Sequence, residues 1–360
     1  MGASALLSID KLQRVNLPNL TKMPPQQIKS TAFSKRTLFS ILLLLVTSII
    51  LFLDVDLYGK IISLLPYNEY DAFLGKKVWI TGSSSGIGRS LALDLCKAGA
   101  HVALSARRHD ELEKVAKLCR EISNGRSSVL VIPLDVTDYN AQSNATDEIV
   151  KNWGEIIDIL VLNAGRSQRK EAMNTSLVET RELFELNYFS YINLAKLVLP
   201  YMVAKNSGHL VILSSLSGII ATPIASTYSS TKFALHGYFD ALRNEISKIH
   251  NIKIQIICPG PVESEISLHT LRDEKNPVSE EGKKMDTTRC TSLMVRAMFY
   301  KSYIQEIWIS QQPFLFLSYL SKFAPFTSRA IFSEIVGPSR IRMLRNGENI
   351  YDVKALFKGK

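Results

Sequence analysis

The sequence is poor in cysteine, and its cysteines are not spaced for metal binding or for a disulfide framework. The 360 residues contain four, with no CxxC pair: Cys96, Cys119, Cys258 and Cys290. A zinc site needs clustered ligands, and a disulfide-stapled domain needs a dense, paired cysteine pattern. We therefore expect buried free thiols and no metal site.

The sequence also lacks a stripe of alternating basic and aromatic residues, and we expect no nucleic-acid partner. The net charge is +10, but it is concentrated at the two ends of the chain. Residues 1–36 contain six Lys and Arg against one Asp, and residues 339–360 contain six against two acids. Basic tails of this kind lie against anionic lipid or are simply solvated.

One long hydrophobic run is present near the N-terminus. Thr37 to Leu53 is seventeen residues without a charge, at the short end of what spans a bilayer. The run predicts a membrane anchor at 37–53, between a basic tail (1–36) and a linker or interfacial segment (54–74). A cleaved secretory signal and a buried core helix are the alternatives, and Asp54 and Asp56 make a poor cleavage site.

The charges around this run predict its orientation. Lys and Arg precede the run and acids follow it, which favours a cytosolic N-terminus and a lumenal domain. Sequons at Asn144 and Asn174 would be usable in the lumen. Lys358, near the position of a cytosolic retrieval signal, favours the opposite orientation.

Apolar strands and amphipathic helices alternate from Gly75 onwards. We expect strands at 77–81, 101–105, 128–134, 159–162, 209–213 and 253–258, separated by helices. Continuous apolar strands between helices indicate a parallel sheet covered on both faces. The sequence thus predicts one α/β domain over 75–309 and a C-terminal extension over 310–360.

A glycine-rich loop follows the first expected strand. In Thr81-Gly82-Ser83-Ser84-Ser85-Gly86-Ile87-Gly88, three glycines let backbone approach a pyrophosphate at a helix N-terminus. A glycine-rich connection without a ligand is the alternative. We expect the cofactor contacts of this loop to come from Gly82, Ser84, Ser85, Gly86, Ile87 and Gly88.

The ends of the next strands indicate which dinucleotide binds. The second strand ends in Ser105-Ala106-Arg107-Arg108, without the acid that usually binds the ribose 2′-hydroxyl of NAD. A guanidinium grips a 2′-phosphate with two hydrogen bonds, so Arg107 predicts NADP(H). Asp135, followed by Val136, is a candidate for the adenine amino group or a helix cap. The fourth strand ends in small cofactor-contacting residues: Asn163, Ala164 and Gly165.

A serine, a tyrosine and a lysine complete the set. Ser215 follows the fifth strand, Tyr228 comes thirteen residues later, and Lys232 stands four residues after Tyr228. Residues at i and i+4 share one helix face. An ammonium in this position lowers the pKa of a nearby phenol and prepares it for proton transfer.

Taken together, these motifs resemble the short-chain dehydrogenase/reductase superfamily over about residues 75–310. The resemblance implies a Rossmann-type doubly wound parallel sheet of seven strands in three layers. It implies Tyr228 as the general acid/base, Lys232 as the group that lowers its pKa and holds the nicotinamide ribose, and Ser215 as the group that orients the carbonyl. It also implies a relay water on Asn187 and carboxamide contacts from Pro259, Gly260, Val262 and Ser264.

The closer resemblance is to the microsomal dehydrogenase/reductase family member 7 group. It is carried by the segments 163–169, 289–290 and 306–314. It implies an anchor in the endoplasmic reticulum membrane, lipophilic carbonyl substrates such as steroids and retinoids, and a homodimer through the helices bearing Asn187 and Tyr228. A catalytically silent cofactor-binding scaffold and an NAD-linked alcohol dehydrogenase remain the alternatives.

Two further segments predict the surroundings of the substrate. Residues 261–288 are polar and form either a mobile lid or a surface loop. Residues 314–332 are rich in aromatics, and they dock on the membrane, cover the substrate mouth or pack into the core.

Overall fold

The computed structural model describes residues 52–246, 251–265, 270–272 and 284–356, together with Thr37, Ser40 and Ser48. The chain divides into two compact units, Met1–Thr47 and Ser48–Lys360. The architecture below is that of the second unit. The predicted anchor at 37–53 falls almost wholly outside the described residues, among which no helix has the length and apolarity to cross a membrane.

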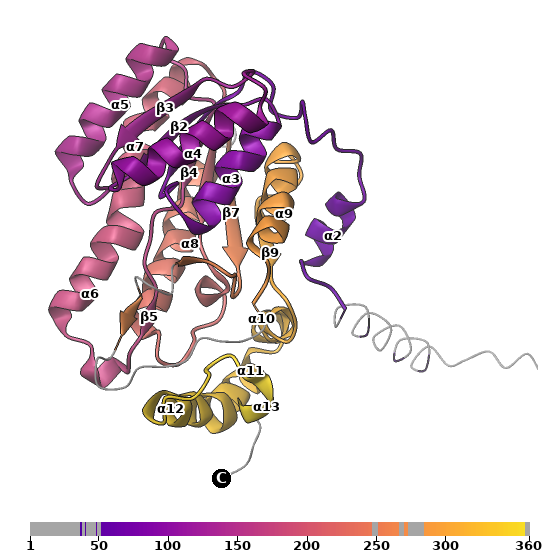
Figure 1. Cartoon of the computed structure of the whole chain (residues 1–360). Helices are drawn as coiled ribbons and strands as arrows, with labels where there is room; N and C mark the ends of the chain where they lie inside the picture. The colour runs from indigo at the N-terminus through magenta and orange to yellow at the C-terminus, as the bar shows by residue number, and fades with distance from the viewer. Residues whose placement is uncertain are drawn as a thin grey trace, which may run out of the picture. The chain divides into compact units, whose positions relative to one another are not determined.

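A seven-stranded parallel sheet forms the centre of the second unit (Figure 1). The strand order is β3-β2-β1-β4-β6-β7-β9. The chain adds strands on one side of β1 up to β3 and then on the other side from β4 onwards, and doubly wound sheets bind ligands between these two halves. The Rossmann-type, seven-stranded prediction is confirmed. The strands are β1 (Lys77–Thr81), β2 (His101–Ala106), β3 (Val129–Pro133), β4 (Ile159–Leu162), β6 (Gly208–Leu213), β7 (Ile252–Pro259) and β9 (Glu306–Ile309).

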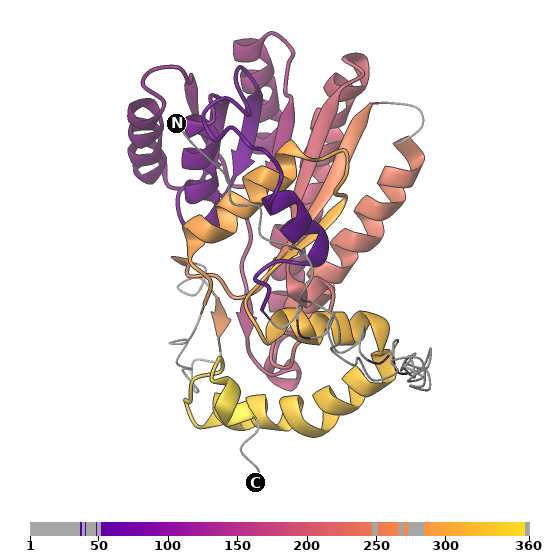
Figure 2. The same ribbon diagram turned by 90° about the vertical axis from the view of Figure 1, so that its right-hand side faces the viewer.

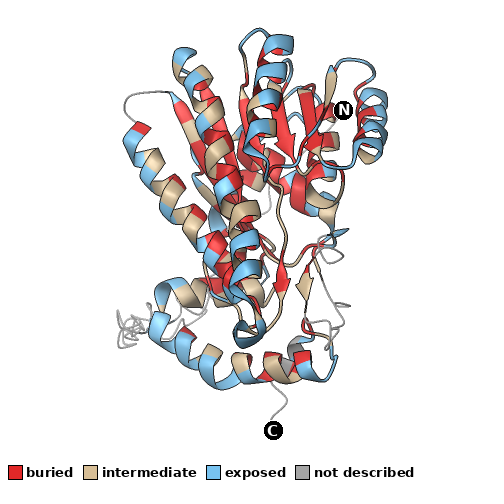
Figure 3. Cartoon of the chain, turned by 90° about the vertical axis from the view of Figure 1, so that its left-hand side faces the viewer, coloured by how far each residue is buried: buried red, intermediate tan, exposed pale blue. Residues whose placement is uncertain are grey.

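Helices cover both faces of the sheet because side chains alternate along each strand. Val78 and Ile80 join the core under one set of helices, whereas Trp79 joins the core on the other face. Figure 3 shows the buried strands between helices whose outer faces are exposed. The first set is α3 (Gly86–Lys97), α4 (His109–Ile122) and α9 (Thr287–Phe299), and the second is α5 (Tyr139–Trp153), α7 (Ser190–Ala204) and α8 (Ser226–Ile246).

The helix that leads into α7 contains a π-helical segment. It runs from α6 (Leu177–Phe184) through η3 (Glu185–Phe189) into α7. Ser176 starts α6 with a capping box, because its hydroxyl accepts from Glu179 N while the Glu179 carboxylate accepts from Ser176 N. The extra residue of a π turn rotates the following side chains, and Asn187 lies within this turn.

The segment after the apolar run packs on the edge strand β9 (Figure 2). Val55 is fully buried and bridges Ile309, and Asp56 accepts hydrogen bonds from Gly59 N and Trp308 N. Asp56 also caps α2 (Leu57–Ser63). Burial raises the pKa of Asp56 to about 6, although the backbone hydrogen bonds partly oppose this.

The C-terminal extension is folded and lies across one end of the sheet in Figures 1 and 2. Its apolar side chains form a separate cluster around Val336, Met343 and Leu344. A small parallel sheet, β5 (Gln168–Arg169) with β8 (Leu271–Arg272), lies outside the main sheet. The extension contains α10 (Phe314–Phe323), α11 (Pro325–Ile331), η6 (Phe332–Val336), α12 (Gly337–Arg345) and α13 (Val353–Leu356).

Candidate active site

The glycine loop is shaped for a ligand at the N-terminus of α3. Gly82 and Gly86 have φ values of +68° and +54°, which disfavour any side chain. A Cβ on Gly82 would lie 2.8 Å from Ala164 Cα, and one on Gly88 would overlap Gly82 O. Ser85 precedes the helix without using its side chain as a cap, so the first N–H groups of α3 remain available to a phosphate.

The side chain of Asn163 holds the start of the glycine loop by hydrogen bonds to its backbone. Its side-chain amide donates to Thr81 O at 2.8 Å and to Gly82 O at 3.1 Å. The Thr81 hydroxyl in turn accepts from Asn163 N and Ala164 N. The ends of β1 and β4 are thereby locked together at the point where the strand order reverses.

A cationic and an acidic side chain lie at the far end of the loop. Arg108 donates to Ser84 Oγ at 3.1 Å and pairs with Glu265 at 3.6 Å, so it spans the loop rather than being simply solvated. The Asp135 carboxylate accepts from the backbone and the hydroxyl of Thr137, whereas the cap of α5 is Asp138. Partial burial alone would raise the pKa of Asp135, but these bonds and the charge of Arg107 outweigh it and lower the pKa.

Ser215, Tyr228 and Lys232 meet at the carboxyl ends of β6 and β7. The Ser215 hydroxyl donates to Pro259 O at 3.3 Å and interacts with the phenol of Tyr228. Lys232 Nζ donates to Leu213 O at 2.8 Å and lies 5.8 Å from the centre of the Tyr228 ring. Gln168 Oε1 accepts from Tyr228 N at 3.1 Å and so fixes the start of α8.

The electrostatics differ from the expectation that Lys232 makes Tyr228 acidic. Burial raises the pKa of Tyr228, and the hydrogen bond with Ser215 and the charge of Arg169 only partly oppose this. Burial also lowers the pKa of Lys232 to about 7. A buried lysine that is readily neutralised is a weak source of positive charge, and here its proton points at a carbonyl rather than at the phenol.

Asn187 is fully buried behind this group. Its carbonyl oxygen accepts from Arg166 N at 2.9 Å, and its amide donates to Arg166 O at 2.9 Å and Thr231 Oγ1 at 3.3 Å. The side chain therefore joins the π turn to the loop after β4 and to α8. The relay water predicted on Asn187 stays a prediction.

A single cleft of about 730 Å³ joins the glycine loop to Ser215, Tyr228 and Lys232. Every predicted cofactor and catalytic residue lines it except Asn187. These residues are Gly82, Ser84, Ser85, Gly86, Ile87, Gly88, Arg107, Asp135, Val136, Asn163, Ala164, Gly165, Ser215, Tyr228, Lys232, Pro259, Gly260, Val262 and Ser264.

Comparison with known proteins decides the family. The model of the short chain dehydrogenase family matches residues 76–275. A human protein, dehydrogenase/reductase SDR family member 7, is 41% identical over 275 residues, which cover 75% of this chain and 80% of that protein. The chain belongs to the short-chain dehydrogenase family.

Two further proteins place this short-chain dehydrogenase among its relatives. The chicken hydroxysteroid 11-beta-dehydrogenase 1-like protein is 32% identical over 259 residues, 69% of this chain and 88% of that protein. An alcohol dehydrogenase from the archaeon Thermococcus sibiricus, solved with 5-hydroxy-NADP, shares the fold with a TM-score of 0.58 at 24% identity. It covers 66% of this chain and 98% of that one. The resemblance to the member 7 group is confirmed, and the dehydrogenase is an oxidoreductase acting on CH–OH and C=O groups with a nicotinamide cofactor.

The C-terminal extension supplies part of the cleft wall of this dehydrogenase. Of the three interpretations of residues 314–332, covering the substrate mouth agrees with the lining, since several of these side chains face the cleft. The contributors from the extension are Phe314, Leu317, Ser318, Phe332, Val336, Arg340 and Tyr351. Aromatic richness was the signal for this segment, but nothing nearby in sequence indicated Tyr351.

Arg169 and Tyr351 connect the extension to Tyr228, since both interact electrostatically with its phenol. Arg169 donates to Ser167 Oγ at 2.8 Å and to the Tyr351 hydroxyl, and its guanidinium lies 5.7 Å from the centre of the Tyr351 ring. Lys284 lies over the same ring at 5.2 Å. Much of the predicted lid at 261–288 falls outside the described residues, but Lys284 and Val262 both line the cleft.

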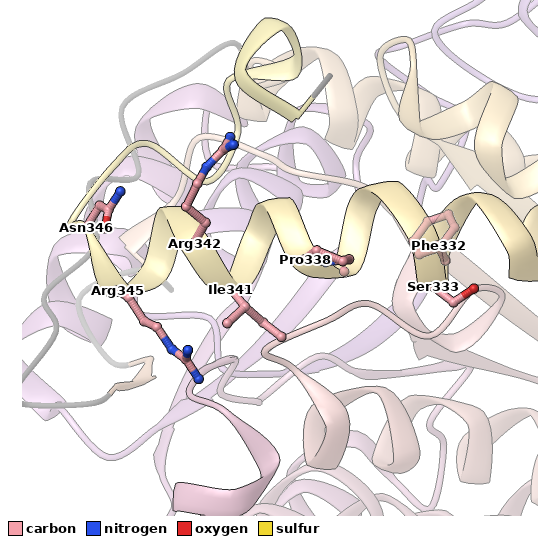
Figure 4. Close-up of a pocket in the computed structure, with 8 residues that line it drawn as sticks. Phe332, Ser333, Pro338, Ile341, Arg342, Arg345 and Asn346 are labelled. Atoms are coloured by element: carbon pink, nitrogen blue, oxygen red, sulfur yellow. The ribbon is translucent and has the colours of Figure 1, made fainter. Parts of the chain in front are cut away.

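A second hollow of about 610 Å³ lies along α12 (Figure 4). Its arginines are committed elsewhere: Arg342 donates to Ala355 O at 2.9 Å, and Arg345 pairs with Glu171 at 2.9 Å.

Within the described ranges no three His, Cys, Asp or Glu side chains are placed to hold a metal ion. All four cysteines are buried and free.

Proposed function

We propose that this protein is an NADP(H)-dependent reductase of lipophilic ketones or aldehydes, such as steroids and retinoids. One observation carries the proposal: a single cleft has Ser215, Tyr228 and Lys232 at one end and the glycine loop with Arg107 at the other. The bound nicotinamide would supply the hydride that reaches the carbonyl carbon. Every other role belongs to side chains of this chain.

The state of Tyr228 favours the reductive direction. Because burial raises its pKa, the phenol is protonated at neutral pH and ready to donate to the oxygen that gains charge. Ser215 would donate a second hydrogen bond to that oxygen. Lys232, already close to both the phenol and the end of β6, would hold the nicotinamide ribose.

The choice of NADP(H) rests on the end of β2. Arg107 lines the cleft there and Arg108 spans the glycine loop, so two guanidinium groups surround the place of a 2′-phosphate. The end of β2 carries Arg107 and Arg108 in place of the acid that would accept hydrogen bonds from the ribose hydroxyls of NAD. Fluorescence titration with NADPH and NADH tests this: tighter binding of NADH would reject the role of Arg107.

The lipophilic substrate is supported by the composition of the cleft beyond Tyr228. Phe314, Leu317, Phe332 and Val336 contribute apolar surface from the extension, and Ile220 lines the same cleft. The name of the chicken relative mentions a hydroxysteroid, which supports the same substrate class.

The decisive experiment is NADPH consumption with steroid, retinal and quinone carbonyls. Turnover of an apolar carbonyl supports the proposal, whereas cofactor binding without any turnover favours the silent scaffold.

We also propose an anchor in the endoplasmic reticulum membrane with a lumenal domain. The apolar run from Thr37 to Leu53 supports the anchor, and Ile61 on α2 and Leu64 directly after α2 leave apolar surface exposed. The sequon residues Asn144 and Asn174 are both exposed in the structure. Glycan addition in microsomes, with protection from protease, tests the lumenal orientation. An unglycosylated, protease-sensitive domain would place it in the cytosol.

A homodimer through the helices bearing Asn187 and Tyr228 completes the proposal. Exposed apolar side chains on these helices support it, since Leu177 and Val178 are 63% exposed and Phe233 is 43% exposed. Sedimentation of the detergent-solubilised full chain tests it, and Phe233→Glu is expected to shift a dimer to monomer.

A further inference from the structure

A polar side chain that the proposed mechanism does not use lies on the same helix face as the catalytic pair. Tyr228, Lys232 and His236 occupy positions i, i+4 and i+8 of α8, so all three face the end of β6. Each contacts a different residue there: Tyr228 the side chain of Ser215, Lys232 the carbonyl of Leu213, and His236 the side chain of Ser214.

The carboxylate of Glu306 contacts the ring of His236 on the side opposite Ser214. Nδ1 of His236 lies 3.1 Å from Glu306 Oε2 on β9, while its Nε2 lies 2.9 Å from Ser214 Oγ. A carboxylate beside Nδ1 keeps the proton on that nitrogen, which leaves Nε2 to accept from the Ser214 hydroxyl. Glu306 is itself oriented by Trp308, whose indole N–H donates to its other oxygen at 2.7 Å.

The contact is enclosed on its remaining side. A Cβ added to Gly218 would lie 2.7 Å from Ser214 Oγ and 3.0 Å from His236 Nε2, so the turn Leu216–Gly218 closes directly over the pair. Cys258 Sγ lies 3.6 Å from the same nitrogen. Ser214 is 4% exposed and lies in the wall of the cleft, where its hydroxyl contacts His236 Nε2.

We propose that His236 is a positioning residue for the catalytic centre, holding the backbone at Leu213–Ser215 through the Ser214 hydroxyl. This stretch bears both the carbonyl that receives Lys232 and the hydroxyl that faces Tyr228. Small displacements of reacting groups reduce rates steeply, by about 100-fold for 1 Å. The inference rests on the proposed reductase function for its catalytic consequence but not for its structural one.

The test compares two histidines on the full chain. His236→Leu removes a side chain that is 13% exposed and contacts Ser214, whereas His209→Leu, at the opposite end of β6, removes a fully buried ring away from the site. We expect His236→Leu to lower kcat about 10- to 100-fold. The NADPH affinity of His236→Leu should stay within about twofold of wild type, and His209→Leu should keep the wild-type kcat.

Rescue and exchange measurements separate positioning from stability. His236→Gln keeps an acceptor for Ser214 and a donor for Glu306, and should recover part of the lost kcat. Amide hydrogen exchange of the 213–219 peptide should accelerate in His236→Leu but not in His209→Leu.

Equal losses of kcat in the two leucine variants, or unchanged exchange in His236→Leu, would overturn the inference. If wild type binds NADPH but reduces no carbonyl, the proposed function fails, and the exchange result alone still decides whether His236 positions this backbone.

Discussion

Replacing Lys232 by methionine should stabilise the fold while weakening the site. The ammonium is buried, and burial lowers its pKa from 10.5 to about 7. At 1.36 kcal/mol per pH unit, this difference disfavours the charged folded form by about 5 kcal/mol. Loss of the hydrogen bond from Lys232 to Leu213 O destabilises the variant by about 1–3 kcal/mol and offsets part of this gain. A net gain of about 2–4 kcal/mol in the free energy of unfolding is expected for Lys232→Met near neutral pH.

The pH dependence has a definite sign. The unfolded chain keeps the lysine proton up to about pH 10.5, whereas the folded chain releases it above about pH 7. Unfolding therefore takes up a proton between these values, and the wild-type contribution to stability rises with pH across that window. The advantage of Lys232→Met should shrink by about 1.4 kcal/mol per pH unit above pH 7 and be lost between about pH 8.5 and pH 10.

Denaturant unfolding of both proteins at pH 6.5 and pH 9 measures this, with the exposed Lys117→Met as the matched control. Saturating NADPH should raise the melting temperature of wild type more than that of Lys232→Met, because the lysine would hold the ribose. A variant that is less stable than wild type at pH 6.5, with a gap that does not change with pH, refutes the reasoning.

Three further changes test separate parts of the site. Arg107→Ala should weaken NADPH binding about 10- to 100-fold and leave NADH binding within about twofold, because only NADPH has the 2′-phosphate; equal weakening of both cofactors in fluorescence titrations would reject the clamp. Gly88→Ala should abolish cofactor binding, since its Cβ would overlap Gly82 O, and calorimetry showing normal NADPH affinity would contradict this. Tyr351→Phe removes the hydrogen bond with Arg169 and should raise KM for apolar carbonyls several-fold with unchanged NADPH affinity. An unaltered KM would show that this contact of the extension does not contribute to substrate binding.

Local sequence patterns predicted six of the seven strands of the main sheet and the glycine loop, whereas β9 was not predicted from its own sequence. The six predicted strands agree with the structure to within one or two residues because each is a short, continuous apolar run between helices. The glycines at 82, 86 and 88 correctly predicted a tight loop. In the structure, a positive φ value or a close backbone contact at each position excludes a larger residue.

Long-range contacts could not be predicted in this way. Arg169 and Tyr351 are 182 positions apart, and Asp56 and Trp308 are 252 positions apart. No periodicity connects such pairs, because they are set by how the terminal segments pack on β9 and over the cleft. The direction of the Tyr228 pKa was likewise missed, because burial depends on the whole fold rather than on the spacing of Tyr and Lys.

The central claim is that the hydroxyl of Tyr228 transfers the proton, and single-residue removal of that hydroxyl tests it most directly. Tyr191→Phe is the matched control, since Tyr191 is also buried, its ring lies 5.3 Å from Lys232 Nζ, and its hydroxyl has no hydrogen-bond partner among the described residues. With the best carbonyl substrate and saturating NADPH, Tyr228→Phe should lower kcat by about 100-fold or more, while Tyr191→Phe stays near wild type. A Tyr228→Phe protein that reduces the substrate at the wild-type rate would contradict the account.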